Sequence, residues 1–214
     1  MANPVTNHLF TRRTARYYTL GNTVNPEKVW VVLHGYAFLA ANFIKEFEQY
    51  GNNDTLIIAP EALSRFYAKG LGGDVAASWM TREDRLADIS DNVTYLDTLY
   101  SEVIEPLGED IELNALGFSQ GVATLTRWAV MGVARFNQLI FWAGDIPNDV
   151  NPESFANLST QTKLTLVYGT EDTLIPPGYV DQLQAMMDSW GVAFERKTFV
   201  GKHEMNQQLL AEII

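Results

Sequence analysis

The chain has 214 residues, of which 47% are hydrophobic and 19% charged, and it contains no cysteine. This composition is typical of a globular protein and excludes disulfide bonds and thiolate catalysis. With 15 Lys and Arg against 26 Asp and Glu, the net charge is −11, which argues against nucleic acid and anionic membrane surfaces as partners.

The first part of the chain predicts an edge strand, then two buried strands separated by a helix. Residues 8–20 are rich in Thr and Tyr and indicate one or two antiparallel edge strands. The apolar runs 28–35 and 54–62 predict strands buried on both faces. Between them, apolar residues at three- and four-residue steps predict a helix over 39–51.

Residues 63–83 show neither a helical nor a strand period. A loop of this length inside a compact domain is usually functional or mobile, so this segment is a candidate lid. The apolar positions from Leu86 to Leu107 then recur at helical spacing and predict one long amphipathic helix.

The rest of the chain continues the alternation, and residues 145–162, like 63–83, are left free to cover a site. The expected strands are 111–119, 136–144, 163–171 and 193–201, and the expected helices are 120–132, 176–191 and 203–214. Such alternation indicates an α/β fold with a mostly parallel sheet, an antiparallel N-terminal edge and helices on both faces. Because no repeat or linker interrupts it, we expect one domain over residues 1–214.

No apolar run is long enough for a signal peptide or a membrane-spanning helix. The default expectation is therefore a soluble, cytoplasmic protein without stable membrane insertion.

One motif at a strand–helix junction carries chemistry. The sequence GFSQG, residues 117–121, places Ser119 between two glycines, the G-x-S-x-G pattern of a nucleophile elbow. At such a turn the serine hydroxyl leaves the sheet at a helix N-terminus, where negative charge is favoured. The alternative is a tight turn without catalytic meaning.

A serine nucleophile needs a base, and the chain has three histidines. His8 lies in the expected edge region, and His34 precedes the serine in the chain. His203 follows the last expected strand, which gives the order Ser, acid, His that this architecture uses. We therefore predict His203 as the base, against the alternative of a solvated histidine at a helix start.

Three carboxylates are candidates to orient that histidine. Asp172 and Glu171 follow the strand 163–171, and Asp145 follows the preceding strand. Asp172 is favoured because its loop is closed by two prolines, which would hold the carboxylate rigidly.

The blocks VLHGY, GFSQG, GTEDTLIP and GKHEM, in this order and spacing, resemble the phospholipase/carboxylesterase family of α/β-hydrolases, which includes acyl-protein thioesterases. The resemblance covers the chain from Val29 to His203. It implies a serine hydrolase that cleaves carboxylic esters or thioesters, as carboxylesterases, lysophospholipases and thioesterases do. Ser119 would be the nucleophile, His203 the general base and Asp172 the orienting acid.

The resemblance also implies an oxyanion hole made by the backbone N–H groups of Tyr36 and Gln120. The chain departs from the family here, because many relatives continue the His–Gly pair with Gly–Asp, whereas this chain reads HGYAFLAANF. Phe38, Trp79, Met80 and Leu174 are candidates for an apolar substrate pocket, although such residues are also common in cores.

We expect no metal and no organic cofactor, since no metal-ligand spacing such as H-E-x-x-H is present. The expected binding partner is a small acyl ester or thioester substrate, and the sequence is compatible with either a monomer or a homodimer. Two alternatives remain: a catalytically silent binding module on the same fold, and a peptidase or deacetylase.

Overall fold

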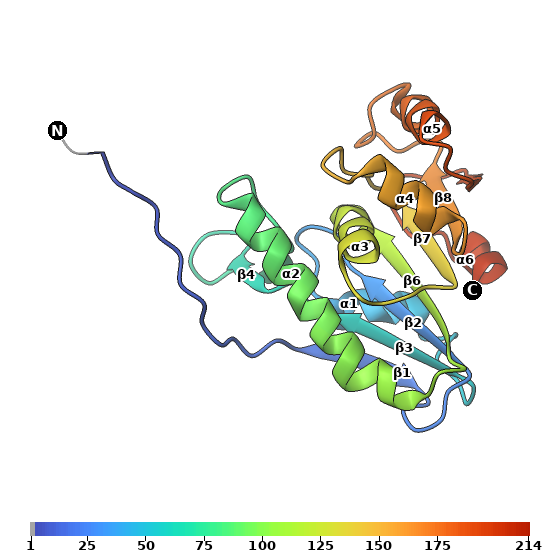
Figure 1. The fold of residues 1–214 in the computed structure, drawn as a ribbon, viewed down its shortest axis with the longest axis horizontal. Coiled ribbons are helices and arrows are strands. Elements are labelled where there is room, and N and C mark those ends of the chain that lie inside the picture. The colour runs from blue at the N-terminus through green and yellow to red at the C-terminus, as the bar shows by residue number, and fades with distance from the viewer. Residues whose placement is uncertain (1–2) are drawn as a thin grey trace.

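The structure is a computed structural model that describes residues 3–214 and is built around one seven-stranded sheet (Figure 1). The outermost strand β1 runs antiparallel to β3, and all other neighbouring strands are parallel. The sequence-based prediction of a mostly parallel sheet with an antiparallel N-terminal edge is confirmed. Across the sheet the strands are β1 (Tyr17–Gly21), β3 (Thr55–Pro60), β2 (Lys28–Leu33), β6 (Glu112–Phe118), β7 (Gln138–Trp142), β8 (Lys163–Gly169) and β9 (Glu195–Phe199).

Helices cover both faces of the sheet (Figure 1). Successive residues of β2 alternate between two cores: Val29 and Val31 pack on one side and Trp30 on the other. A strand covered on both faces must be apolar at every position, which explains its unbroken hydrophobic run. One face carries α1 (Ala40–Phe43), the 3₁₀-helix η1 (Ile44–Phe47) and α6 (Gln207–Ile213), and the other α2 (Arg85–Leu99), α3 (Gln120–Met131), α4 (Pro152–Ser159) and α5 (Tyr179–Ser189).

Several expected elements are shorter than their patterns suggested. In the expected edge region 8–20 the strand begins only at Tyr17 and continues to Gly21, and the helix expected over 39–51 ends at Phe47 as a 3₁₀ turn. The long helix is α-helical to Leu99 and continues as a π turn and a 3₁₀ turn, η2 (Tyr100–Ile104) and η3 (Glu105–Leu107). Within residues 3–214, no helix is both long and apolar enough to span a bilayer.

The prediction of an irregular loop over 63–83 was wrong. The segment contains an antiparallel hairpin of β4 (Ser64–Tyr67) and β5 (Val75–Ser78). Gly70 and Gly72 adopt φ of 62° and 112° at its tip, a region that glycine enters without steric cost.

Residues 145–162, to which the sequence patterns assign no element, contain α4. Its start has a signal that periodicity overlooked: the Asn151 side chain accepts a hydrogen bond from Ser154 N–H, and Pro152 occupies the first turn. Asn at the N-cap followed by Pro is a favoured helix beginning.

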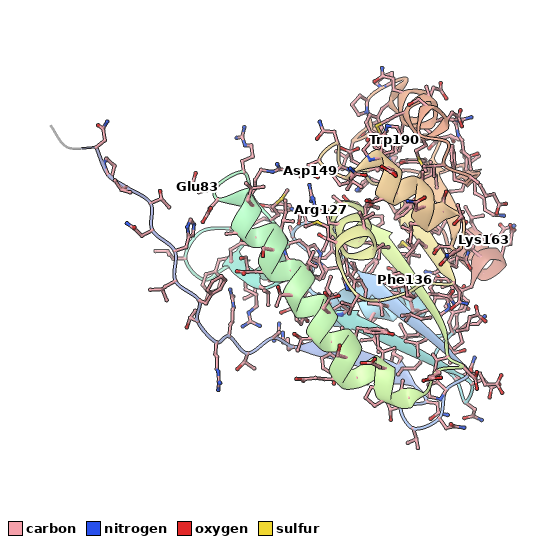
Figure 2. All side chains as sticks on the ribbon, viewed as in Figure 1. Glu83, Arg127, Phe136, Asp149, Lys163 and Trp190 are labelled. Carbon is pink, nitrogen blue, oxygen red and sulfur yellow. The ribbon has the colours of Figure 1, made fainter. Side chains whose placement is uncertain are left out.

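A buried arginine ties three segments together on the α3 face. The Arg127 side chain, 6% exposed, donates hydrogen bonds to Asp149, and Arg85 of α2 donates to the same carboxylate. Figure 2 shows Arg127 and Asp149 close together between α3 and the segment before α4. Although partial burial raises the pKa of Asp149, the hydrogen bonds from both arginines outweigh it and lower that pKa below its usual value.

Candidate active site

The candidate residues meet at the carboxyl edge of the sheet. Gly35 lies just beyond β2, Ser119 directly follows β6, and Asp172 and His203 follow β8 and β9. In open sheets of this kind, the crevice outside the carboxyl ends of the strands is where ligands bind.

Ser119 occupies a strained turn between β6 and α3. Its φ of 53° and ψ of −118° are far from the conformations that L-residues prefer, and such positions cost roughly 1–3 kcal/mol. Two backbone hydrogen bonds hold the turn: Ser119 N–H donates to Trp142 O at 2.9 Å, and Val122 N–H donates to Ser119 O at 3.0 Å. Among residues 3–214 the Ser119 hydroxyl has no hydrogen-bond partner, so it is free for a substrate.

Glycine is required on both sides of the serine because the backbone is crowded there. A Cβ atom at Gly121 would lie 2.3 Å from Leu33 O, and one at Gly117 would lie 2.6 Å from Gly121 O. Real Cβ atoms do not approach so closely, so any side chain would push α3 away from the sheet.

We expect Gly121→Ala to lower the free energy of unfolding by about 3 kcal/mol, the upper part of the usual range for overpacking. The contacted atom is a backbone oxygen of β2 and cannot rotate away. Urea denaturation measures the effect, and Met131→Ala, at a 60% exposed position of the same helix, is the control and should change stability by about 0.5 kcal/mol or less. Equal stabilities of the two variants would contradict the argument.

His203 and Asp172 form a short hydrogen bond. The distance from His203 Nδ1 to Asp172 Oδ2 is 2.7 Å, and Leu174 N–H donates to the other carboxylate oxygen at 2.9 Å. The Asp172 side chain is 1% exposed and that of His203 20%. A carboxylate only accepts, so Nδ1 carries the proton and Nε2 of the neutral ring keeps its lone pair.

The His203 ring lies next to the serine turn. Its centroid is 5.0 Å from that of Phe118, the residue before Ser119, and Trp142 Nε1 donates to the carbonyl of Glu204 at 2.9 Å. Within residues 3–214 no hydrogen bond joins His203 to the Ser119 hydroxyl. Catalytic contacts of this kind often shorten only when substrate binds.

Of the three candidate acids, only Asp172 contacts His203. Asp145 is exposed and accepts a hydrogen bond from the Tyr179 hydroxyl. Burial and this carboxylate together raise the pKa of Tyr179. Glu171 is exposed at the end of β8.

The other two histidines are engaged elsewhere. His8 pairs with Asp84 on the surface at 2.6 Å. His34 is fully buried, its Nδ1 lies 2.7 Å from Gly35 O, and its Nε2 accepts a hydrogen bond from Ala62 N–H at 3.1 Å. Both ring nitrogens are therefore occupied, and the ring is neutral with its proton on Nδ1.

Burial lowers the pKa of His34, against smaller opposing effects of Gly35 O and Glu61. The unfolded chain therefore binds a proton at this residue more readily than the folded protein. Stability should fall as the pH drops below about 6.5, the usual histidine pKa, with this group contributing at most about 1.4 kcal/mol per pH unit. Urea denaturation between about pH 8 and 5.5 should show a smaller loss for His34→Asn than for the unmodified protein; parallel losses would contradict this origin.

The Tyr36 and Gln120 amides border Ser119 and are unengaged. Neither N–H has an acceptor within residues 3–214. Gln120 N–H belongs to the first residue of α3, where helix N–H groups lack partners within the helix. A Cβ at Gly35 would lie 3.2 Å from Ser119 Cβ, so the chain entering Tyr36 passes directly beside the serine.

The four candidate pocket residues differ in their exposure to solvent. Phe38 and Leu174 are 45% and 70% exposed. The Phe38 ring meets the Phe118 ring edge-on at 6.0 Å, and the Phe118 ring also packs against the His203 ring. Phe38 therefore presents apolar surface beside the residue that precedes Ser119, and Leu174 presents it in the loop that carries Asp172.

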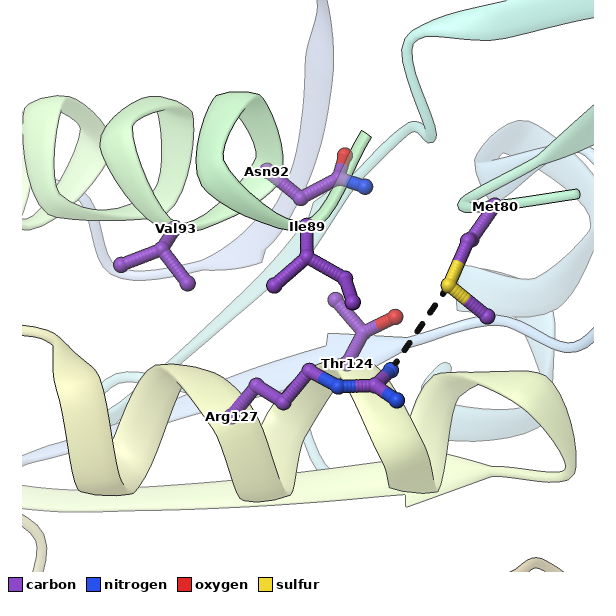
Figure 3. Close-up of a pocket in the computed structure, with 6 residues that line it drawn as sticks. All are labelled: Met80, Ile89, Asn92, Val93, Thr124 and Arg127. Atoms are coloured by element: carbon purple, nitrogen blue, oxygen red, sulfur yellow. Dashed lines mark hydrogen bonds between the residues drawn. The ribbon is translucent and has the colours of Figure 1, made fainter. Parts of the chain in front are cut away.

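The other two candidates lie in different surroundings. Trp79 is 1% exposed and belongs to the core, with its Nε1 donating to His34 O at 2.8 Å. Met80 lines a small cavity between α2 and α3, where its sulfur faces Arg127 (Figure 3). The remaining residues around this cavity are Ile89, Asn92, Val93 and Thr124.

Within residues 3–214, no group of three or more His, Asp and Glu side chains is arranged to hold a metal ion. The site thus consists of an acid–histidine pair beside a strained serine and two unengaged amides.

Comparison with known proteins places the fold. No family model and no curated protein matches the chain. Among solved structures, acyl-protein thioesterase 2 of Zea mays has a TM-score of 0.71 at 18% identity, over 94% of this chain and 96% of that one. The carboxylesterase of Bacillus cereus has a TM-score of 0.66 at 12% identity, over 93% and 91%, and esterase PE8 one of 0.65 at 19% identity, over 94% and 100%. The chain therefore has the α/β-hydrolase fold.

Proposed function

We propose that the protein is a serine hydrolase that cleaves carboxylic esters or thioesters through an acyl-serine intermediate. The observation that carries the proposal is the 2.7 Å bond between His203 and the buried Asp172, formed beside a serine held at positive φ. The solved structures with the same fold include an acyl-protein thioesterase and a carboxylesterase, which supports this reaction class.

In the proposed first step, His203 Nε2 takes the hydroxyl proton of Ser119 as Oγ attacks the carbonyl carbon. The carbonyl oxygen becomes negative and accepts hydrogen bonds from the Tyr36 and Gln120 amides. His203 then gives the proton to the leaving alcohol or thiol, and an acyl-serine remains.

In the second step, water loses a proton to His203 and attacks the acyl carbon, which releases the acid and restores the serine. Asp172 keeps the proton of His203 on Nδ1 and stabilises the imidazolium in both steps. In enzymes of this mechanism, the loss of one oxyanion donor raises the activation barrier by roughly 2.7–4 kcal/mol.

The exposed apolar surfaces of Phe38 and Leu174 favour an acyl group that is itself apolar. The test is labelling with a fluorophosphonate, with the modified residue located by mass spectrometry, followed by hydrolysis of p-nitrophenyl esters of increasing acyl length. A label on Ser119 together with ester turnover supports the proposal. A chain that neither reacts nor hydrolyses any ester would instead be a binding module on this fold.

A further inference from the structure

The two amides proposed as oxyanion donors come from segments far apart in the chain. Tyr36 follows β2, whereas Gln120 begins α3 after β6. Both must face one oxygen atom within hydrogen-bond distance, so their separation has to be set by something that joins the two segments. The Gln120 side chain and the hairpin strand β5 make such a connection.

The side-chain amide of Gln120 accepts one hydrogen bond and donates another to the backbone just beyond β5. Its Oε1 accepts from Trp79 N–H at 3.0 Å, and its Nε2 donates to Met80 O at 2.7 Å. A backbone N–H can only donate and a carbonyl can only accept, so the orientation of the side-chain amide is determined. The partners lie 41 and 40 residues away in sequence.

The same β5 segment holds the loop that carries Tyr36. Ala37 N–H donates to Ala77 O at 2.9 Å, and Ala77 N–H donates to Phe38 O at 3.2 Å. Two residues further on, the Trp79 indole donates to His34 O at 2.8 Å. These bonds enclose Tyr36 between two anchored points, and Ala37 is held at φ 63°.

We propose that Gln120 is a positioning residue whose side chain, through Ser78–Met80, sets the distance between the Tyr36 and Gln120 amides and so preorganises the oxyanion hole. The inference rests on the proposed function. Preorganised donors stabilise charge that develops in the transition state and affect substrate binding much less. The side chain therefore acts on kcat through the backbone.

The test compares Gln120→Met with the unmodified protein. Methionine has a similar length but forms neither bond, and the backbone N–H of residue 120 is retained. We expect kcat for a p-nitrophenyl ester to fall about 10-fold or more, less than the 10²–10³ lost on removing a donor outright, with KM changed by about 2-fold or less. The second-order rate of fluorophosphonate labelling should fall by the same factor.

Two further variants keep the test sharp. Gln120→Glu retains an acceptor for Trp79 N–H but sets a carboxylate against Met80 O, and should lose kcat in the same way even if Gln120→Met does not fold. Thr162→Val is the matched control, because it removes the buried hydrogen bond from Thr162 Oγ1 to Phe136 O just before β8, at the opposite edge of the sheet. It should lower Tm and leave kcat unchanged.

If the unmodified protein is active and the Gln120 variants have a kcat within about 2-fold of that of Thr162→Val, this inference is overturned and the proposed function is not. A fall in Tm together with unchanged kcat would do the same, since a merely structural side chain predicts that pattern. An unmodified protein that is neither labelled nor able to hydrolyse esters would overturn the proposed function, and this inference with it.

Discussion

Replacing Ser119 with alanine should abolish ester hydrolysis, with a loss in kcat of about 10⁴-fold or more, the effect typical of removing the nucleophile from a serine triad. The attacking oxygen is then absent, and neither His203 nor the amides can replace it. The fold should persist because the Ser119 hydroxyl has no hydrogen-bond partner within residues 3–214, and alanine tolerates φ of 53° about as poorly as serine does.

The measurement is steady-state hydrolysis of a p-nitrophenyl ester by purified Ser119→Ala, with Tm recorded in parallel. Ser189→Ala is the control, because that serine lies at the end of α5 and its hydroxyl only donates to Met186 O. Ser119→Ala that keeps more than a few per cent of the activity would show that another residue is the nucleophile. Fluorophosphonate should label the control and leave Ser119→Ala unmodified.

The second large effect is expected at the acid. Asp172→Asn should preserve folding and substrate binding yet reduce kcat by about 10⁴-fold, as the equivalent change does in the best-studied serine protease triad. The asparagine amide can donate to Nδ1 of His203, which would move the ring proton to Nε2. The nitrogen that must accept the serine proton would then be blocked.

Asp145→Asn is the matched control, since it makes the same chemical change one strand away. Asp145 is exposed and accepts from the Tyr179 hydroxyl, a bond that the asparagine oxygen can keep. Its kcat should stay within about 2- to 3-fold, the range of a surface substitution. A crippled Asp145→Asn with a nearly normal Asp172→Asn would reverse the assignment of the acid and leave the serine-hydrolase proposal standing.

The sheet and its connections could be predicted from local patterns. Buried parallel strands are apolar at every position, and β2 and β3 therefore stand out as unbroken runs. The chain order of Ser119, Asp172 and His203, each after a strand of one parallel sheet, is enough to predict that they lie at one edge. Parallel pairing alone requires this, because all carboxyl ends then point the same way.

Local patterns fail where a short structural element and an irregular loop have the same composition. The hairpin of β4 and β5 was expected as a loop because its strands are four residues long and its tip is rich in glycine. Short strands carry too few alternating positions to be told from irregular chain. The start of α4 did carry a signal, Asn151 followed by Pro152, that hydrophobic periodicity alone does not detect.

Local sequence patterns are enough to predict the α/β fold and the chain order of the three candidate catalytic residues, because strands buried on both faces must be apolar at every position. The three-dimensional packing shows that Asp172, rather than Asp145, reaches His203, and that Trp79 is core while Phe38 is exposed. It alone revealed the two bonds between the Gln120 side chain and β5. Aromatic and amide side chains occur both in protein cores and on surfaces, so the residue type does not reveal its surroundings. Its partner depends on which distant segment packs against it.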